Sequence, residues 1–405
     1  MIVQLEINNN TTPASQFLTW APAPCRIRMT NPAGATPPSV SIKLSSVSAA
    51  GGGAVGFRTG TTGAFASTLT LQVPTNGTSV SFFAAGTTPS SSNGDVKIEA
   101  RAGTTLVASA PCMVRIRKNA NTLKAPEKAR FVAAFAQLNN QGLGRFTDFR
   151  EMHRQTLALN QAHGAPGFLP WHRAYLLDLE RELQAIDASV TLPYWRFDQP
   201  APNIFKPDFM GVSDNLGTVT FANNNPLQFW KTDGQPGVNR RPLFNTAVAP
   251  PLLSEAQTLA LGTSYAQFRQ PMEIDPHGQA HVSFGGVIRS PGTAPRDPLF
   301  FLLHCNVDRL WAKWQRQNSR FNPAVVASFN NNNASPVGHR LQDTMWPWNG
   351  VTGGTRPPNA PGGTMAPSPI IPAPGLSPRV QDMLDYHGVI SAASIQGFDY
   401  DDVPL

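Results

Sequence analysis

The chain has few charged residues, few cysteines and no long hydrophobic run. Only 14% of its 405 residues are charged, against about 25% in an ordinary soluble domain. Three cysteines are too few for a disulfide scaffold or a four-cysteine zinc site. No apolar run approaches the roughly 18 residues of a membrane-spanning helix, so we expect no membrane interaction. The first residues lack a basic stretch followed by an apolar one, so we expect a cytoplasmic protein by default, or one exported with a partner.

Apolar and turn-forming residues are plentiful. Hydrophobic residues make up 41% of the chain, enough for a sizeable core. The 33 glycines and 38 prolines predict long, irregular loops. The formal net charge is +7, but lysine and arginine are scattered and no nucleic-acid-binding motif accompanies them. We therefore expect a folded enzyme that does not bind nucleic acid.

Residues 1–117 have the pattern of an all-β domain. Seven short segments alternate apolar and polar residues with a period of two, separated by clusters of glycine, proline, asparagine and serine. These segments are VQLEI, CRIRM, SVSIKL, TLTLQV, SVSFFA, VKIEA and CMVRIR. They predict a sandwich or barrel that serves as an accessory domain. Cys25 and Cys112 both fall on predicted strands, where they either pair or remain free thiols.

A short linker, 118–124, precedes a different pattern in residues 125–405. Helical periodicity is present in 126–139, 145–161, 170–187 and 295–318. Loops rich in asparagine, proline and glycine join these segments. The sequence therefore predicts a two-domain fold. An N-terminal all-β sandwich or barrel is followed by a mainly α-helical core, which is a helix bundle with long irregular loops.

Six of the eight histidines fall into two groups of three. The groups are His153, His163 and His172, and His277, His281 and His304. We expect His153 in the middle of a helix, and His277 and His281 on one helix face because they are four residues apart. A single buried histidine is usually a hydrogen-bonded core residue, but two complete triads in apolar surroundings predict metal ligands.

The ligand type favours copper over zinc or a hard cation. Gly278 follows His277, so the glutamate of the HExxH zinc-protease motif is missing. Hydrolytic two-metal sites usually mix carboxylates with imidazoles, whereas two all-imidazole triads suit copper and leave positions open for a small ligand. A copper pair at the usual two-metal spacing of roughly 3.5–4 Å would be a redox site that uses dioxygen.

Long motifs around these histidines resemble a known family. HGAPGFLPWHRAYLLDLE is similar to the first copper motif of the tyrosinase and polyphenol oxidase (type-3 dicopper) family. PHGQAH and DPLFFLLHCNVDRLWAKWQ are similar to the second. Near the end, GFDYDD, with Phe398 and Tyr400, resembles the aromatic-x-Tyr motif that closes the family's catalytic domain. The resemblance covers about residues 125–400 and implies a dicopper catalytic domain.

The resemblance implies a role for each motif residue. His153, His163 and His172 would bind the first copper ion, and His277, His281 and His304 the second. Asp308, one turn after His304, would anchor that helix. Gly278, Val282 and Arg289 would lie in or around the substrate pocket. Glu273 corresponds to the acid that orients a water in many members, and would be catalytic.

The chain also departs from the family pattern. Leu303 stands where many members have a second histidine, and no cysteine lies between Arg130 and His172 to form a thioether. The segment 286–296 lacks the aromatic residue that covers the first copper in some members. Gly278 replaces an asparagine that has been linked, with the water-orienting acid, to deprotonation of monophenols. These features favour oxidation of o-diphenols over hydroxylation of monophenols.

The expected function is therefore a copper-dependent oxidoreductase of the catechol oxidase or tyrosinase type. Two copper ions and dioxygen as co-substrate would oxidise o-diphenols to o-quinones, and monophenol hydroxylation (monooxygenase activity) is a further activity of such sites. The alternatives are an o-aminophenol oxidase, a dioxygen carrier with the same dicopper site, or a carbohydrate- or surface-binding role for the β domain. The expected partners are small phenolic substrates and a helper protein that loads copper.

Overall fold

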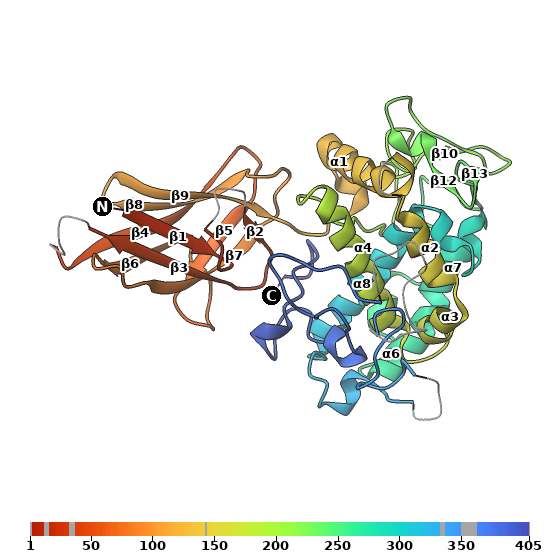
Figure 1. Ribbon diagram of the computed structural model, residues 1–405. Coiled ribbons are helices and arrows are strands. Elements are labelled where there is room, and N and C mark those ends of the chain that lie inside the picture. Colours follow the sequence, from red (N-terminus) through yellow and green to blue (C-terminus); the bar gives the residue numbers. More distant parts are fainter. Residues whose placement is uncertain are drawn as a thin grey trace. The chain divides into compact units, whose positions relative to one another are not determined.

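The computed structural model describes residues 2–11, 16–31, 37–141, 144–332, 337–349 and 363–404. The chain divides into two compact units: Met1–Ile116 with Gly397–Leu405, and Arg117–Gln396. Strands build the first unit and helices dominate the second (Figure 1). The β-rich N-terminal region and the helical region that the sequence predicts are both present.

Two sheets form the first unit. One has the strand order β1 (Ile2–Ile7), β3 (Ala23–Thr30), β7 (Val80–Thr88), β5 (Ala54–Arg58). The other has the order β2 (Gln16–Leu18), β9 (Thr105–Val114), β8 (Val96–Ala102), β4 (Ser39–Ser48), β6 (Thr68–Pro74). All neighbours are antiparallel except β2 and β9. The short strands β2 and β5 were not predicted, because neither has a long alternating pattern.

The two sheets share one hydrophobic core. In β3 every second residue is buried, the pattern of a strand with one face in the core. Ile27 from one sheet and Ile98 from the other are both fully buried in the same cluster. Cys25 and Cys112 are buried there as free thiols, and burial raises the pKa of each to about 12. The unit is therefore a β-sandwich.

The last residues belong to the first unit, whereas the sequence placed them in the catalytic domain. Trp20 donates two hydrogen bonds to this segment, from its backbone N–H to Asp399 Oδ2 and from its indole Nε1 to the carbonyl of Tyr400, both at 2.8 Å. The rings of Phe398 and Tyr400 pack edge to face with centroids 6.1 Å apart. The aromatic-x-Tyr motif therefore closes the β-sandwich unit in this chain.

The second unit contains eight α-helices in its described part. They are α1 (Ala125–Ala136), α2 (Phe146–Arg154), α3 (Thr156–Ala162), α4 (Phe168–Ile186), α5 (Glu255–Leu259), α6 (Tyr265–Met272), α7 (Gln279–Val282) and α8 (Leu299–Asn318). Two-residue strands pair as β10 (Val212–Ser213) with β11 (Val219–Thr220), and as β12 (Lys231–Thr232) with β13 (Gln235–Pro236). The strands β14 (Arg240–Pro242) and β15 (Phe284–Gly286) form an antiparallel ribbon.

The helix predicted over 145–161 is interrupted. Gln155 has extended backbone angles (φ −60°, ψ 140°), so α2 ends at Arg154 and α3 begins at Thr156. His153 therefore lies in the last turn of α2, and its expected position in the middle of a helix is wrong. The predicted start of the last helix at 295 is also early, because Asp297 Oδ1 accepts the Leu299 N–H and caps α8 there.

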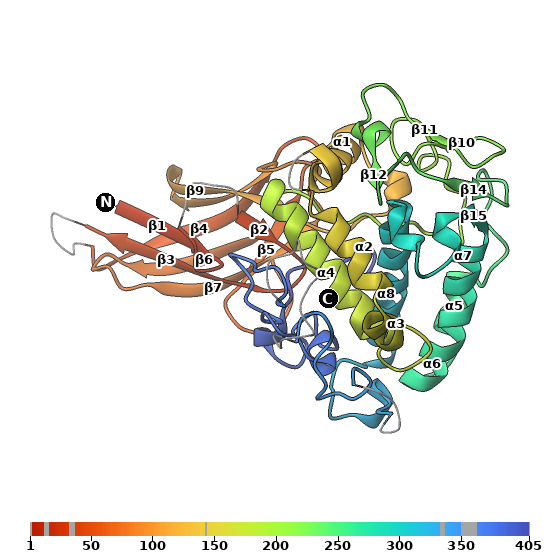
Figure 2. The same cartoon turned by 45° about the vertical axis from the view of Figure 1, so that its right-hand side comes forward.

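Helices α4 and α8 pack together at the centre of the second unit, as both views show (Figures 1 and 2). Both are almost completely buried along their length. Pro170 is tolerated because it lies in the first turn of α4, where backbone nitrogens donate no hydrogen bond within the helix. Among the described helices, none combines the length and the hydropathy that a membrane span requires.

Candidate metal centre

Six histidines converge in the second unit from six separate segments. His153 lies in the last turn of α2, His163 follows α3, His172 lies in α4, His277 lies in the π-helical segment Glu273–Gly278, His281 lies in α7 and His304 lies in α8. Gly164, with φ +72°, takes the left-handed conformation that turns the chain after His163. The structure therefore brings together all six residues that the sequence singles out.

The first triad is compact. The candidate ligand atoms of His153, His163 and His172 all lie within 4.8 Å of one another. Their ring centroids are 5.0 to 5.6 Å apart. His153 and His172 are about 1% exposed, so this donor set lies inside the protein.

The second triad has the spacing of metal ligands. The candidate ligand atoms of His277, His281 and His304 lie within 4.8 Å of one another. The Nε2 atoms of His281 and His304 are 3.2 Å apart. Two imidazole nitrogens bound at about 2.0–2.1 Å to one tetrahedral ion would be about 3.3 Å apart. The observed separation therefore fits two ligands of a single ion.

The two triads lie against each other through α4 and α8. The rings of His172 and His304 stack with centroids 4.2 Å apart and an interplanar angle of 11°. His153 and His304 also make an edge contact, at 6.4 Å. One ligand from each triad thus belongs to a central helix, and the pair of helices sets the distance between the two sites.

Backbone carbonyls fix the orientation of most of the rings. Nδ1 of four histidines lies 2.7 to 2.9 Å from a carbonyl oxygen: His153 from Pro291, His172 from Phe168, His277 from Glu273, and His281 from Ile288. Because a carbonyl only accepts, each Nδ1 carries the proton and donates it, which leaves the Nε2 lone pair free.

The free nitrogens provide the test of whether a metal fits. Nε2 of His153, His172 and His277 is buried and has no hydrogen-bond partner among the described residues. Such buried polar atoms are costly unless something binds them. Imidazoles that donate from Nδ1 to a carbonyl and offer Nε2 are the usual form of metal-bound histidine. The residues present therefore fit two metal ions with all-imidazole ligands.

Burial also keeps these imidazoles uncharged. It lowers the pKa of His163 and of His281 to about 4, and lowers the pKa of the other four well below the ordinary value. Neighbouring histidines lower the pKa of His304 further, because two adjacent positive charges repel. The neutral form is the one that binds metal, so the site is ready for metal at neutral pH.

A cavity of about 210 Å³ opens beside the two triads. Five of the histidines line it with Gly278, Val282, Arg289, Pro291 and Phe300. Val282 is 39% exposed and Arg289 is also exposed, so the cavity reaches the surface on their side. The three residues that the sequence places in the substrate pocket, Gly278, Val282 and Arg289, therefore all lie at this cavity.

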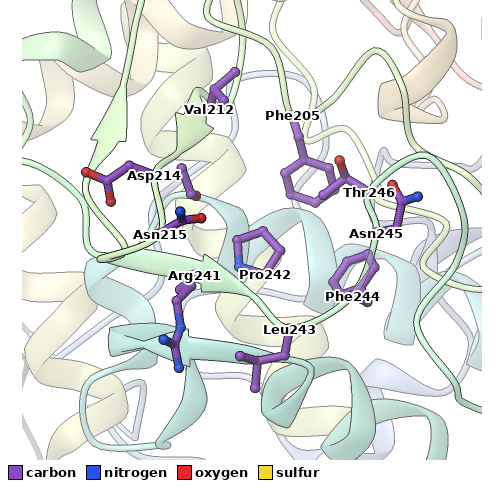
Figure 3. A pocket seen from close by; sticks show the side chains of 11 residues that line it. Phe205, Val212, Asp214, Asn215, Arg241, Pro242, Leu243, Phe244, Asn245 and Thr246 are labelled. Atoms are coloured by element: carbon purple, nitrogen blue, oxygen red, sulfur yellow. The ribbon is translucent and has the colours of Figure 1, made fainter.

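A larger cavity in the same unit offers no imidazole or thiol ligands among its described lining residues. Its volume is about 820 Å³, and Phe205, Arg241, Pro242, Leu243 and Phe244 contribute to its lining (Figure 3). None of its described lining residues is a histidine or a cysteine. The metal centre is therefore the stronger candidate for the functional site.

Comparisons with known proteins agree with the histidine geometry. Residues 143–317, which contain both triads, match the family described as the common central domain of tyrosinase. A tyrosinase from Streptomyces glaucescens is 35% identical over 268 residues, which cover 58% of this chain and 92% of that protein. A tyrosinase from Streptomyces antibioticus is 32% identical, covering 58% and 94%. The chain belongs to the tyrosinase family.

Membership of the tyrosinase family makes the chain a copper oxidoreductase of a type-3 dicopper family. The fold is shared more widely. The structure of deoxygenated hemocyanin from Rapana thomasiana matches with a TM-score of 0.50 and 21% identity, over 71% of this chain and 69% of that one. At 21% identity the match establishes the fold alone, and the activity has to be argued from the residues of the site.

Glu273 does not line the cavity of this tyrosinase-family site. Its Oε1 accepts the Gly164 N–H at 2.6 Å, and its Oε2 accepts from Arg269 Nη1 at 2.7 Å. Its backbone carbonyl accepts from His277. Burial raises the pKa of its carboxyl group, against the opposing effects of Gly164 and Arg269. Glu273 thus connects the residue after His163 with a ligand of the other triad.

Asp308 joins α4 to α8 next to the ligands. Its Oδ1 accepts from Arg173 Nε at 2.6 Å, and its Oδ2 lies 3.3 Å from Arg117 Nη1. Arg173 directly follows His172 along α4, and Asp308 lies one turn after His304. All three charged side chains are at most 1% exposed. The carboxylate therefore braces the two helices that carry one ligand from each triad.

Sequence reasoning missed several residues that shape the tyrosinase-family site. Arg117 and Arg173 gave no signal, because partners 191 and 135 residues away form no local pattern. The carbonyls of Ile288 and Pro291 orient two ligands, but any residue type offers a carbonyl. Phe300 packs on His304 with centroids 4.2 Å apart, and the apolar run before His304 was the one available sign of it.

Proposed function

We propose that the two triads hold two copper ions and that the chain oxidises o-diphenols to o-quinones, with dioxygen as co-substrate. The observation that carries the proposal is that the Nε2 atoms of His153, His172 and His277 are buried and have no hydrogen-bond partner among the described residues. His153, His163 and His172 would hold one copper ion, and His277, His281 and His304 the other. Copper bound there supplies the redox chemistry that moves electrons from the diphenol to dioxygen.

The protein's own part is to hold the ligands still and to shape the cavity. Carbonyl acceptors fix the tautomer of four imidazoles before any metal arrives, so little reorganisation is needed on binding. Pro291 and Phe300 give the cavity apolar walls suited to an aromatic ring. Gly278 leaves room beside His277, where a side chain would narrow the cavity. Two diphenols and one dioxygen would give two quinones and two waters.

Monophenol hydroxylation is proposed as a minor activity. Both carboxylate oxygens of Glu273 already accept hydrogen bonds, from Gly164 and from Arg269. Gly278 offers no side-chain amide near His277. The cavity lining therefore includes no carboxylate or amide side chain among the described residues that would take the proton of a monophenol.

The opening of the cavity favours an enzyme over a dioxygen carrier. A carrier needs space for dioxygen alone, whereas this cavity of about 210 Å³ reaches the surface beside Val282 and Arg289. An o-aminophenol would fit the same space, so that activity is kept as the alternative substrate class. Because ligands such as His172 and His304 are at most 1% exposed, a helper protein that loads copper also fits the proposal. The cytoplasmic location stays a prediction.

Oxygen uptake by the copper-loaded protein tests the function. With 4-methylcatechol, uptake should be rapid, and the matching monophenol, 4-methylphenol, should be consumed far more slowly. 2-Aminophenol in the same assay separates the two substrate classes. Dioxygen that binds reversibly, with no consumption when 4-methylcatechol is added, would instead identify a carrier.

A further inference from the structure

One charged residue lies in an otherwise apolar and histidine-lined cavity. Among the described residues that line it, Arg289 is the only one besides the histidines with an ionisable side chain. Arg289 is exposed and makes no ion pair with another described residue. Glu273 accepts from Arg269, and Asp297 pairs with Arg240 at 2.7 Å, so both carboxylates have other arginine partners. The guanidinium therefore faces solvent and cavity without a counter-charge from the described residues.

The backbone on both sides of Arg289 is fixed to the metal ligands. The carbonyl of Ile288, one residue before it, accepts from His281 of the second triad at 2.7 Å. The carbonyl of Pro291, two residues after it, accepts from His153 of the first triad at 2.9 Å. The position of Arg289 is thus set relative to both triads.

Further hydrogen bonds hold the segment that carries this arginine. The Val287 N–H donates to the Asn239 carbonyl at 3.0 Å, and Thr293 Oγ1 donates to the Val287 carbonyl at 2.7 Å. The Ala294 N–H donates to the Ser290 carbonyl at 2.8 Å. A side chain on a rigid backbone loses less entropy when it binds a ligand, so this segment is suited to recognition.

We propose that Arg289 determines substrate specificity by binding the carboxylate of o-diphenols that carry a short acidic side chain. The inference rests on the proposed function and names its substrate class. A guanidinium matches the planar carboxylate through two parallel N–H···O bonds, and an ammonium group in the same place would be repelled. The ring would occupy the apolar part of the cavity, with its hydroxyl groups toward the triads and its side chain toward Arg289.

Three catechols with different charges test the proposal on the copper-loaded protein. They are 3-(3,4-dihydroxyphenyl)propanoate, the neutral 4-methylcatechol, and 4-(2-aminoethyl)catechol. We expect kcat/KM for the acid to exceed that for the amine by about tenfold, which corresponds to about 1.4 kcal/mol. Most of the difference should lie in KM. It should shrink as salt rises above physiological ionic strength, where screening already acts over about 8 Å.

Variants separate the local contact from the general positive charge. R289Q should remove the preference for the acid, whereas R289K should retain part of that preference. R241Q is the matched control, because it removes one exposed arginine from the other cavity (Figure 3). It should keep the preference. Copper content and melting temperature, measured for each variant, show that the site is intact.

A binding measurement keeps this inference separate from the proposed function. Calorimetric titration with 3-phenylpropanoate and 2-phenylethylamine, which lack hydroxyl groups, reports charge recognition without turnover. If 4-methylcatechol is not oxidised, the proposed function fails, and the titration still decides the role of Arg289. Equal binding of the two compounds, or an acid preference that R289Q leaves intact, would overturn the inference.

Discussion

Replacement of Asp308 by asparagine tests how the two central helices are held together. The Asp308 side chain is 1% exposed and accepts from Arg173 at 2.6 Å, with Arg117 at 3.3 Å. D308N keeps the size and one oxygen acceptor but removes the negative charge. Arg117 would keep its ion pair with Glu180, at 2.8 Å. Arg173 would keep the neutral acceptors Gln315 Oε1 and the Met383 carbonyl.

The expected cost follows from the burial of these charges. Removal of one partner from a buried ion pair costs about 3–5 kcal/mol, because the remaining charge stays desolvated. Since the remaining arginines keep other acceptors, we expect a loss near the lower end, about 3 kcal/mol. That is more than a hundredfold change in the ratio of folded to unfolded protein. Copper affinity should also fall about tenfold or more, because Arg173 adjoins His172.

Urea denaturation of the metal-free protein, followed by tryptophan fluorescence, measures the first effect. Of the eight tryptophans, all but Trp20 lie in Arg117–Gln396, so the signal reports the unit that contains Asp308. D208N is the matched control: Asp208 is 55% exposed and lies 3.6 Å from Lys128, and its loss should cost less than about 1 kcal/mol. If D308N is as stable as D208N and binds copper like wild type, the bracing role assigned to Asp308 is wrong.

Three further outcomes are expected. H172A and H281A should each hold one copper ion per chain and lose turnover, whereas H339A, outside both triads, should keep two; metal analysis that finds zinc as the tightly bound ion would contradict this. G278N should raise the rate of monophenol hydroxylation relative to catechol oxidation by about tenfold or more: Gly278 has helical angles, and a Cβ there meets only the Glu273 carbonyl, at 3.3 Å. An unchanged ratio in oxygen-uptake assays would remove the argument from Gly278. Metal-free protein should be most stable above pH 6.5 and should lose stability toward pH 4. The folded state holds the pKa of His163 and His281 at about 4 while the unfolded chain takes up protons near pH 6.5. The expected slope, up to about 1.4 kcal/mol per pH unit for each histidine, is measured by urea midpoints at several pH values, and a flat profile would refute it.

The sequence predicted the elements that repeat a local pattern. Strand β3 alternates buried and exposed residues throughout, and α4 and α8 contain long apolar runs. The two histidine triads were also predictable from the sequence, because the members of each triad lie within 28 residues of one another. Local spacing was enough to group them, although it could not show that His172 and His304 stack.

Features that depend on distant contacts were not predictable in this way. The break at Gln155 has no proline or glycine to mark it. The assignment of Gly397–Leu405 to the β-sandwich depends on Trp20, which lies 379 residues before its partner Asp399. Arg117 reaches Asp308 across 191 residues. Each of these is a tertiary contact between segments whose own sequences permit several partners.

The same distinction decides which parts of the metal centre should tolerate substitution. Four rings are oriented by backbone carbonyls, so the side chains of residues such as Ile288 and Pro291 are free to vary as long as the backbone keeps its path. That path depends on Gly286, which has a φ of +93° and where a Cβ would lie only 2.3 Å from the Asn239 carbonyl oxygen, so no side chain fits. Because β14 and β15 pair at this glycine, the ribbon positions the segment that contacts both triads. Arg289 lies between the Ile288 and Pro291 carbonyls, and among the described residues of this segment it alone lines the cavity with a charged side chain. Because the backbone is fixed, substrate specificity depends on the side chain at this position.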